Sequence, residues 1–181
     1  MFSLAKDITL KPRAIGIGIF LLALALRLGF ALQWHELPYG DAPLWDAKGH
    51  DDWAMKILQG QFLQPTAFYS SPLYPFFLAL IYQLFGHSFL IVSIINAMID
   101  SATCTMLGII ALEYFGVCAA VLTGLLAALC RSMIFYTAPV MKESLGLFLL
   151  AAFTYLFLRA LRESKARDFV LGGFCLGLCA L

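Results

Sequence analysis

The stretch AIGIGIFLLALALRLGFALQ, residues 14–33, is a run of 20 residues with a single charge, Arg27. At a rise of about 1.5 Å per residue, a helix of this length crosses the roughly 30 Å of hydrocarbon in a bilayer. The basic residues Lys6, Lys11 and Arg13 come shortly before it. A cleaved signal peptide is the alternative, but the apolar part is too long and no small-residue cleavage site follows. We therefore expect an uncleaved membrane anchor.

The composition of the whole chain agrees with a membrane protein. Of the 181 residues, 62% are hydrophobic and 13% are charged, and the mean hydropathy is +0.88. Soluble domains are about 45–50% apolar. The net charge of +1 comes without a basic stripe on which a phosphate backbone could lie, which excludes nucleic acid as a partner. The five cysteines lie in apolar segments without zinc-type spacing and are interpreted as small apolar filling residues.

Five further apolar segments follow, separated by short polar or Gly/Pro-containing breaks. Four of them are predicted to span the membrane: residues 88–112, 115–133, 139–161 and 168–181. The remaining one, PLYPFFLALIYQLF at 72–85, has 14 residues and is short for a span. Its aromatic residues fit the boundary between lipid and water, so an interfacial helix is predicted there. The expected fold is an all-α, polytopic transmembrane helical bundle.

The positions of Lys and Arg support the interfacial placement of residues 72–85. Short cytoplasmic loops carry an excess of these residues. If 72–85 does not cross, the loop RALRESKAR at 159–167 falls on the same side as the basic N-terminus; if it crosses, the loop falls on the opposite side. We therefore predict a cytoplasmic N-terminus, in what we expect to be a bacterial cytoplasmic membrane. Residues 34–71 and the link 132–138 then lie together on the outer face.

The first outward loop contains LWDAKGHDDWA, residues 44–54, which has three aspartates, a lysine and a histidine in an otherwise apolar chain. Residues 46–59 are predicted to form a second interfacial helix that Gly60 ends, with Asp46 at or near its N-cap. At i, i+4, i+7 and i+11, one face of this helix carries Asp46, His50, Trp53 and Ile57. We interpret this face as the functional one.

Two other aspartates of this loop, Asp51 and Asp52, point away from that face. They are interpreted as solvated acids that complement the helix dipole near its N-terminus. The capping role of Asp46 and a chemical role for its carboxylate are compatible with each other.

The second outward stretch is TAPVMKESL, where a helix is expected to open at Pro139 and to carry Lys142 and Glu143 in its first turns. A glutamate suits the positive end of a helix dipole, whereas a lysine is disfavoured there and calls for an anionic partner. By the predicted topology, this pair shares a side of the membrane with Asp46. Our hypothesis is that Lys142 provides a cation for a lipid phosphate, while the neighbouring carboxylates hold or polarise a hydroxyl group.

The predicted spans contain Arg27, Asn96, Asp100 and Arg131. Unpaired charge in hydrocarbon is costly, so each needs a partner, and structural pairing is the preferred interpretation. Asn96 and Asp100 are four residues apart and share one helix face, which is expected to look into the protein.

The order of these elements resembles the GT-C superfamily of membrane glycosyltransferases, in the branch of dolichyl-phosphate-mannose-protein mannosyltransferases and bacterial aminoarabinose transferases. The resemblance covers most of the chain. After the first span come WDAKGHDDWAMKILQGQF, FYSSPLYPFFLALIYQLFGHS, INAMIDSAT, VMKESLGLFLL and the Gly-rich GGFCLGL. It implies that residues 1–181 are the N-terminal part of a longer GT-C transmembrane module.

In that family, an essential acid in the first outward loop precedes an aromatic and a small residue on the following helix. Asp46 matches the acid and Ala54 the small residue. Ala47 stands where many relatives have a second acid, and His50 stands where an aromatic is usual. These two departures are evidence against a bound divalent metal. They are weaker evidence against the match of Asp46 to the family's essential acid.

The resemblance also implies the reaction. A sugar would move from a polyprenyl-phosphate donor to a protein, lipid or glycan acceptor at the outer face, by an inverting displacement at the anomeric carbon. Asp46 would be the catalytic base and Lys142 a contact of the phosphate. His50 and Glu143 would help to bind and orient the substrates.

Two other functions stay open. A transporter or flippase also carries polar residues in its spans, but such proteins usually show inverted repeats with interrupted helices, and no such repeat is visible. A noncatalytic membrane subunit, or a truncated gene product, is the second alternative, because the last apolar segment ends abruptly at Leu181.

Overall fold

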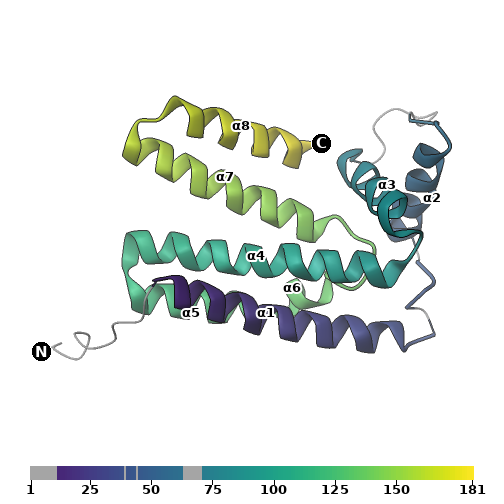
Figure 1. The fold of residues 1–181 in the computed structure, drawn as a ribbon, viewed down its shortest axis with the longest axis horizontal. Helices are drawn as coiled ribbons and strands as arrows, with labels where there is room; N and C mark the ends of the chain where they lie inside the picture. Colours follow the sequence, from purple (N-terminus) through teal and green to yellow (C-terminus); the bar gives the residue numbers. More distant parts are fainter. Residues whose placement is uncertain (1–11, 39, 44, 63–70) are drawn as a thin grey trace, which may run out of the picture.

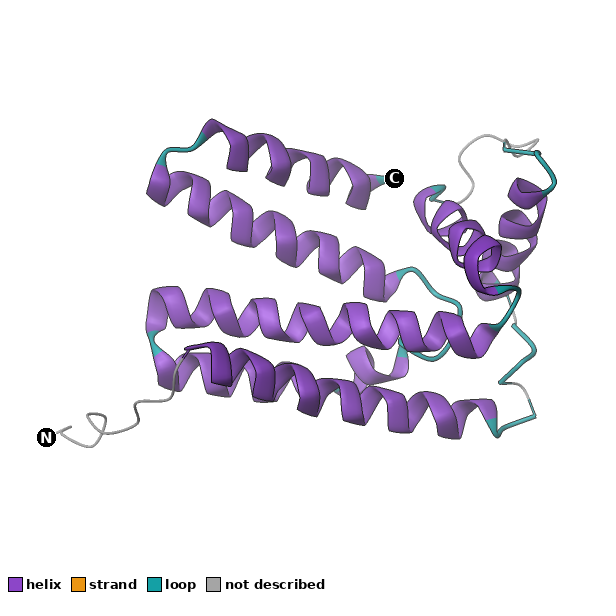
Figure 2. Cartoon of the chain, in the orientation of Figure 1, coloured by secondary structure: helices purple, strands orange, loops and turns teal. Residues whose placement is uncertain are grey.

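The computed structural model describes residues 12–38, 40–43, 45–62 and 71–181, and every regular element in these ranges is an α-helix (Figures 1 and 2). The helices are α1 (Pro12–His35), α2 (Asp46–Leu58), α3 (Leu73–Phe85), α4 (Phe89–Phe115), α5 (Val117–Ala128), α6 (Arg131–Phe135), α7 (Glu143–Glu163) and α8 (Ala166–Ala180). The predicted all-α class is confirmed. Lys6 and Lys11 lie outside the described residues.

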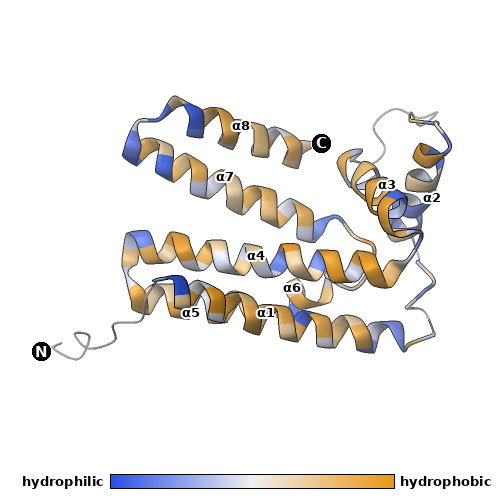
Figure 3. Cartoon of the chain, in the orientation of Figure 1, coloured by the Kyte–Doolittle hydropathy of each residue, from blue (hydrophilic) through white to orange (hydrophobic). Residues whose placement is uncertain are grey.

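Three helices are long and apolar enough to cross a membrane, namely α1, α4 and α7. They lie roughly side by side with α5 and α8 in one bundle (Figure 1). Helices α4 and α7 run in the same direction, opposite to that of α1, α5 and α8. The hydropathy colouring shows apolar residues along most of their length (Figure 3). Helices α5 and α8 are shorter, with 12 and 15 residues.

The two ends of the bundle differ. One end carries α2, α3 and the segment between α6 and α7, whereas the other end carries the start of α1 and the α7–α8 turn (Figure 1). The basic residues of the α7–α8 turn are at the latter end, where Arg162 pairs with Glu113 at the end of α4, at 3.0 Å. The two loops that the sequence assigned to one side therefore do share one end of the bundle.

Helix α1 packs through a single stripe of buried residues at every fourth position: Ile15, Ile19, Ala23, Arg27 and Ala31. This stripe faces α4 and α5. Glycines let the helices approach closely at Ile19, because a Cβ on Gly108 of α4 would lie 2.8 Å from Ile19 Cδ1. Small residues at such crossings are typical of membrane helix packing.

Arg27 is fully buried and connects three helices. Its guanidinium pairs with Asp100 of α4 and donates to the carbonyls of Ala127 and Ala128 at the end of α5, at 3.3 and 3.1 Å. The structural pairing expected for Arg27 and Asp100 is confirmed. Because this cation binds the last carbonyls of α5, it helps to stabilise a helix end at this point.

The segment predicted as a span over residues 115–133 contains two helices in the structure: α5, which ends at Ala128, and the short α6. Arg131, the first residue of α6, is exposed and has no ion pair with the described residues, so the pairing expected for it is not observed. Asn96 does find a partner, as described below.

The start of α7 also differs from the prediction. The helix begins at Glu143 with Lys142 as its N-cap residue, and not at Pro139. The segment before it is held by other hydrogen bonds: the Ala138 carbonyl accepts from Ser93 Oγ at 2.6 Å, and the Pro139 carbonyl accepts from the Met141 N–H at 2.9 Å. These contacts hold residues 138–141 outside the helix.

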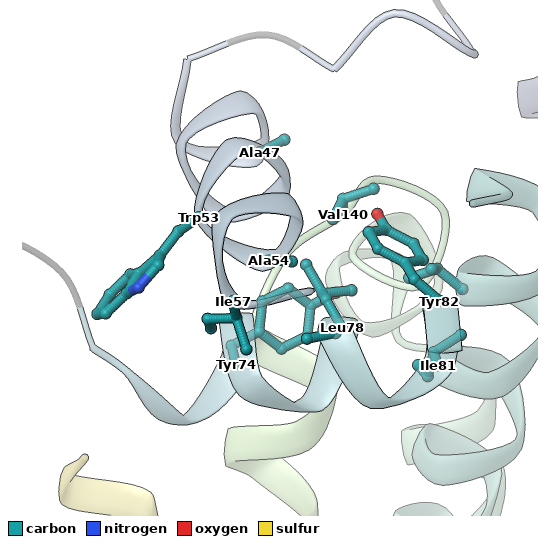
Figure 4. Packing of buried hydrophobic residues seen from close by; sticks show 11 residues of the cluster. Ala47, Trp53, Ala54, Ile57, Tyr74, Leu78, Ile81, Tyr82 and Val140 are labelled. Carbon is teal, nitrogen blue, oxygen red and sulfur yellow. The ribbon is translucent and has the colours of Figure 1, made fainter. Parts of the chain in front are cut away.

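Helices α2 and α3 pack against each other at their end of the bundle. Ala54 and Ile57 of α2 lie beside Tyr74 and Leu78 of α3 in a buried cluster that also includes Val140 (Figure 4). The other side of α3 is apolar and exposed, with Phe76, Leu80, Leu84 and Phe85 at 41%, 54%, 66% and 59%. Helix α3 therefore has an apolar face that the described residues leave uncovered.

Candidate functional site

Asp46 is the first residue of α2, and its side chain does not cap the helix. The N-cap position is Trp45, which has a φ of 55° and makes no capping hydrogen bond through its side chain. The prediction that Asp46 lies at or near the N-cap is confirmed, because Asp46 directly follows that position, but the side-chain cap is not formed. As an exposed acid in the first turn, Asp46 still complements the helix dipole.

His50 lies one turn further along α2 and is buried, with 4% of its surface exposed. Its ring meets the ring of Tyr74 edge to face, with 5.3 Å between centroids. Burial lowers the pKa of His50 below its ordinary value of 6.5, and the Lys142 cation lowers it further, whereas the Asp46 carboxylate raises it. The imidazole is therefore neutral at pH 7.

The charges of Asp46 and Lys142 both act on this imidazole, and the Tyr74 ring that His50 contacts lines a cavity together with Lys142. Asp46 begins α2, whereas Lys142 is the N-cap residue of α7. The structure thus brings three of the four predicted site residues together. Glu143, the fourth, follows Lys142 directly and starts α7.

Tyr74 is a site residue that the sequence analysis did not single out. It is 1% exposed, and its hydroxyl oxygen accepts a hydrogen bond from Asn96 Nδ2 of α4 at 3.3 Å. Burial raises the pKa of Tyr74 above its ordinary value, and the charge of Glu143 adds to this rise. The phenol therefore keeps its proton. A tyrosine within SSPLYP was the available signal, but nothing in the local pattern indicates that it lines a cavity with Lys142 and Glu143.

A cavity of about 260 Å³ opens beside these residues. Its polar lining comes from Ser71, Tyr74, Lys142 and Glu143. Its apolar lining comes from Leu73, Leu145, Gly146, Leu149, Leu178, Cys179 and Ala180, on α3, α7 and α8. We call it the lysine cavity. It combines one cation, one carboxylate and one phenol with a leucine-rich wall.

A second cavity, of about 240 Å³, is lined in part by the segment before α7. Its wall contains the aromatic residues Trp34, Phe89, Phe135 and Tyr136. Ala47, the neighbour of Asp46, also lines it, as do Pro139 and Met141. Asp46 is thus adjacent in sequence to a residue that lines this aromatic cavity. Its charge also acts on His50, which lies beside the lysine cavity.

Asp51 behaves differently from the prediction of a solvated acid. Its carboxylate accepts hydrogen bonds from Tyr82 Oη and from His87 Nε2, both at 2.8 Å, and only 13% of its side chain is exposed. It therefore ties α2 to α3 and to the turn before α4. Asp52 is exposed, as predicted.

Metal binding has no candidate centre in the described part of the chain, where no three His, Cys, Asp or Glu side chains lie close enough together to hold an ion.

Comparison with known families identifies the chain. The family model of the dolichyl-phosphate-mannose-protein mannosyltransferases matches residues 69–181, which is more than half of the chain. The match includes Tyr74, Asn96, Lys142 and Glu143, and it begins after Asp46 and His50. No curated protein and no solved structure matches the chain.

The matched family is one of glycosyltransferases, and three helices of this chain could span a membrane. The molecule is therefore a membrane protein with an expected glycosyltransferase activity. It belongs to the dolichyl-phosphate-mannose-protein mannosyltransferase family.

Proposed function

We propose that the protein transfers a sugar from a polyprenyl-phosphate donor to an acceptor at the outer membrane face, as an inverting transferase of the GT-C type. The observation that carries this proposal is that Asp46 and the buried His50 share α2, while the Tyr74 ring that His50 contacts lines one cavity with Lys142, in a chain of the mannosyltransferase family. On this proposal, the chain supplies the N-terminal part of the transmembrane module.

The placement in the membrane is supported by the two ends of the bundle. The exposed apolar residues Phe76, Leu80 and Leu84 share one face of α3, which suits a helix lying in the outer interface. The basic α7–α8 turn lies at the opposite end, which suits the cytoplasmic side. With this orientation, the N-terminus is cytoplasmic and both cavities open near the outer face.

The lysine cavity suits the lipid end of the donor. A polyprenyl tail stays in the bilayer, so its phosphate must be met at the interface. Lys142 supplies the positive charge for that phosphate, while Leu145 and Leu149 of α7 and Leu178 of α8 offer an apolar surface to the first isoprenoid units.

The reaction follows from this arrangement. Asp46 takes the proton of the acceptor hydroxyl, and the acceptor oxygen forms a bond to the anomeric carbon of the sugar. The bond between that carbon and the phosphate oxygen breaks, and its electron pair leaves with the lipid phosphate. Lys142 stabilises the charge that develops there. Attack opposite the leaving phosphate inverts the anomeric centre, while His50 and Glu143 orient donor and acceptor.

Transfer of radiolabelled sugar tests the proposal. The full-length protein is assayed in membrane vesicles with a panel of polyprenyl-phosphate sugars. Asp46→Asn should lower transfer by at least about a hundredfold, because it removes the base. The matched control is Asp52→Asn, which makes the same change at an exposed position of the same helix and should leave transfer unchanged.

Near-normal transfer by Asp46→Asn would remove Asp46 from the role of base. Movement of the labelled lipid across the vesicle membrane, with no sugar transfer by the wild-type protein, would support a transporter instead.

A further inference from the structure

The hydrogen bonds around Tyr74 leave unused polar groups beside the lysine cavity. Tyr74 lines this cavity together with Lys142 and Glu143. Its hydroxyl oxygen accepts from Asn96 Nδ2, so the phenolic proton is not used in that bond. The backbone of Met141 also hydrogen-bonds the phenol. No side chain among the described residues accepts the phenolic proton.

Three buried polar atoms near the same phenol also have no hydrogen-bond partner in the described structure: His50 Nδ1, Asn96 Oδ1 and Glu143 Oε2. His50 touches the Tyr74 ring, Asn96 binds its hydroxyl, and the charge of Glu143 acts on it. His50 and Asn96 are 4% and 0% exposed. Buried polar atoms are normally paired, so a group of unpaired ones around one phenol points to a ligand.

The chemistry of these atoms selects the ligand. An amide oxygen and a carboxylate accept hydrogen bonds, and they repel the oxygens of a phosphate. An isoprenoid chain makes no hydrogen bonds at all. A sugar hydroxyl both donates and accepts, and therefore satisfies a phenolic proton and neighbouring acceptors together.

We propose that Tyr74, held by Asn96 and flanked by His50 and Glu143, binds a hydroxyl group of the donor's sugar ring and thereby determines which sugar the enzyme accepts. This inference rests on the proposed function, with the phosphate of the same donor at Lys142. Sites that hydrogen-bond a substrate hydroxyl discriminate strongly against ligands that lack it. The role of Tyr74 is thus one of specificity, distinct from the base Asp46.

Binding of two lipids to the full-length protein tests the inference. The probes are polyprenyl-phosphate-mannose and the sugar-free polyprenyl phosphate of the same chain length. Tyr74→Phe keeps the buried ring and removes only the hydroxyl. It should weaken binding of the mannosyl lipid about tenfold, as expected for one lost hydrogen bond, and leave the sugar-free lipid unaffected.

The matched control is Tyr82→Phe, the same change on the same helix. Tyr82 is also buried, but its hydroxyl is bonded to Asp51 and does not line the lysine cavity. Binding of both lipids should be unchanged. Equal losses for both lipids with Tyr74→Phe, no loss for either, or the same loss with Tyr82→Phe would each overturn the inference.

The two proposals can fail separately. If the wild-type protein binds both lipids equally well, the Tyr74 hydroxyl does not recognise the sugar, although sugar transfer can still be observed. If the wild-type protein binds neither lipid and transfers no sugar, the proposed function fails, and the inference on Tyr74 fails with it.

Discussion

The buried guanidinium of Arg27 on α1 pairs with the carboxylate of Asp100 on α4 and at the same time binds the final carbonyls of α5. One side chain therefore fixes three helices relative to each other. This relationship, more than any single apolar contact, explains why α5 ends where it does.

Arg27→Met should destabilise the protein strongly. It leaves Asp100 buried without its cation and leaves the Ala127 and Ala128 carbonyls without this donor, and breaking such a pair costs about 3–5 kcal/mol. Adding Asp100→Leu should restore much of the loss, because the charge is then removed together with its partner. Thermal unfolding in detergent measures both. A double variant no more stable than Arg27→Met would contradict this account.

Gly124 of α5 is required for the close approach of α1. A Cβ at this position would overlap with Ile19 Cδ1 and would lie 2.6 Å from Cγ1 and 3.2 Å from Cγ2 of the same side chain. Gly124→Ala should therefore cost about 1–3 kcal/mol of stability, as overpacking generally does. Ile19→Ala introduced on top of it should relieve the overlap.

The control for this prediction is Gly18→Ala on α1, where an added Cβ meets nothing within 4 Å. It should not lower the melting temperature. If Gly124→Ala is as harmless as Gly18→Ala, the helices are not packed as closely as described.

Asp51→Asn should loosen the attachment of α2. The change removes a carboxylate that accepts from Tyr82 and His87, and hydrogen bonds to a charged group contribute about 1.5–3 kcal/mol each when buried. Because His87 is 41% exposed, we expect the lower end of this range. Hydrogen–deuterium exchange over residues 46–58 should become faster. Asp52→Asn, the exposed neighbour, should leave this exchange unchanged; equal acceleration in both variants would argue against the contact.

His50 should make stability depend on pH. Burial and the Lys142 cation lower its pKa, so between pH 6.5 and that lowered pKa the unfolded chain binds more protons than the folded one. Stability therefore falls as the pH falls through this window. The melting temperature of the wild type should drop more steeply from about pH 7 to pH 5 than that of His50→Gln. Parallel curves for the two proteins would show that His50 is not buried in its neutral form.

Lys142→Gln should weaken binding of the sugar-free polyprenyl phosphate by about tenfold or more, because it removes the cation expected to pair with the phosphate. Raising the salt concentration should weaken the wild type more than the variant. Lys56→Gln is the control, since Lys56 is an exposed lysine in the last turn of α2, at the opposite end of that helix from Asp46. A similar effect of both substitutions would indicate only a general attraction of charge.

The local pattern of the sequence predicted most of the helices. Residues 46–59 and 72–85 were expected as helices, and the structure gives Asp46–Leu58 and Leu73–Phe85. The joint placement of Asp46 and Lys142 at one end of the bundle also followed from the distribution of basic residues. Both results depend on features that act over a few neighbouring residues or on the order of the spans.

The local sequence pattern was enough to predict the helical class, the apolar segments and the polar outer stretches around Asp46 and Lys142, because a helix forms its hydrogen bonds within itself and the length of an apolar run can be read directly. The break after Ala128, the pairing of Asp51 and the place of Tyr74 became visible only in the folded molecule. Each of these depends on a partner far away in the chain: Arg27 for the end of α5, Tyr82 for Asp51, and Asn96 for Tyr74. Buried polar groups must pair with whichever partners packing brings close to them, and a local sequence pattern does not identify those partners.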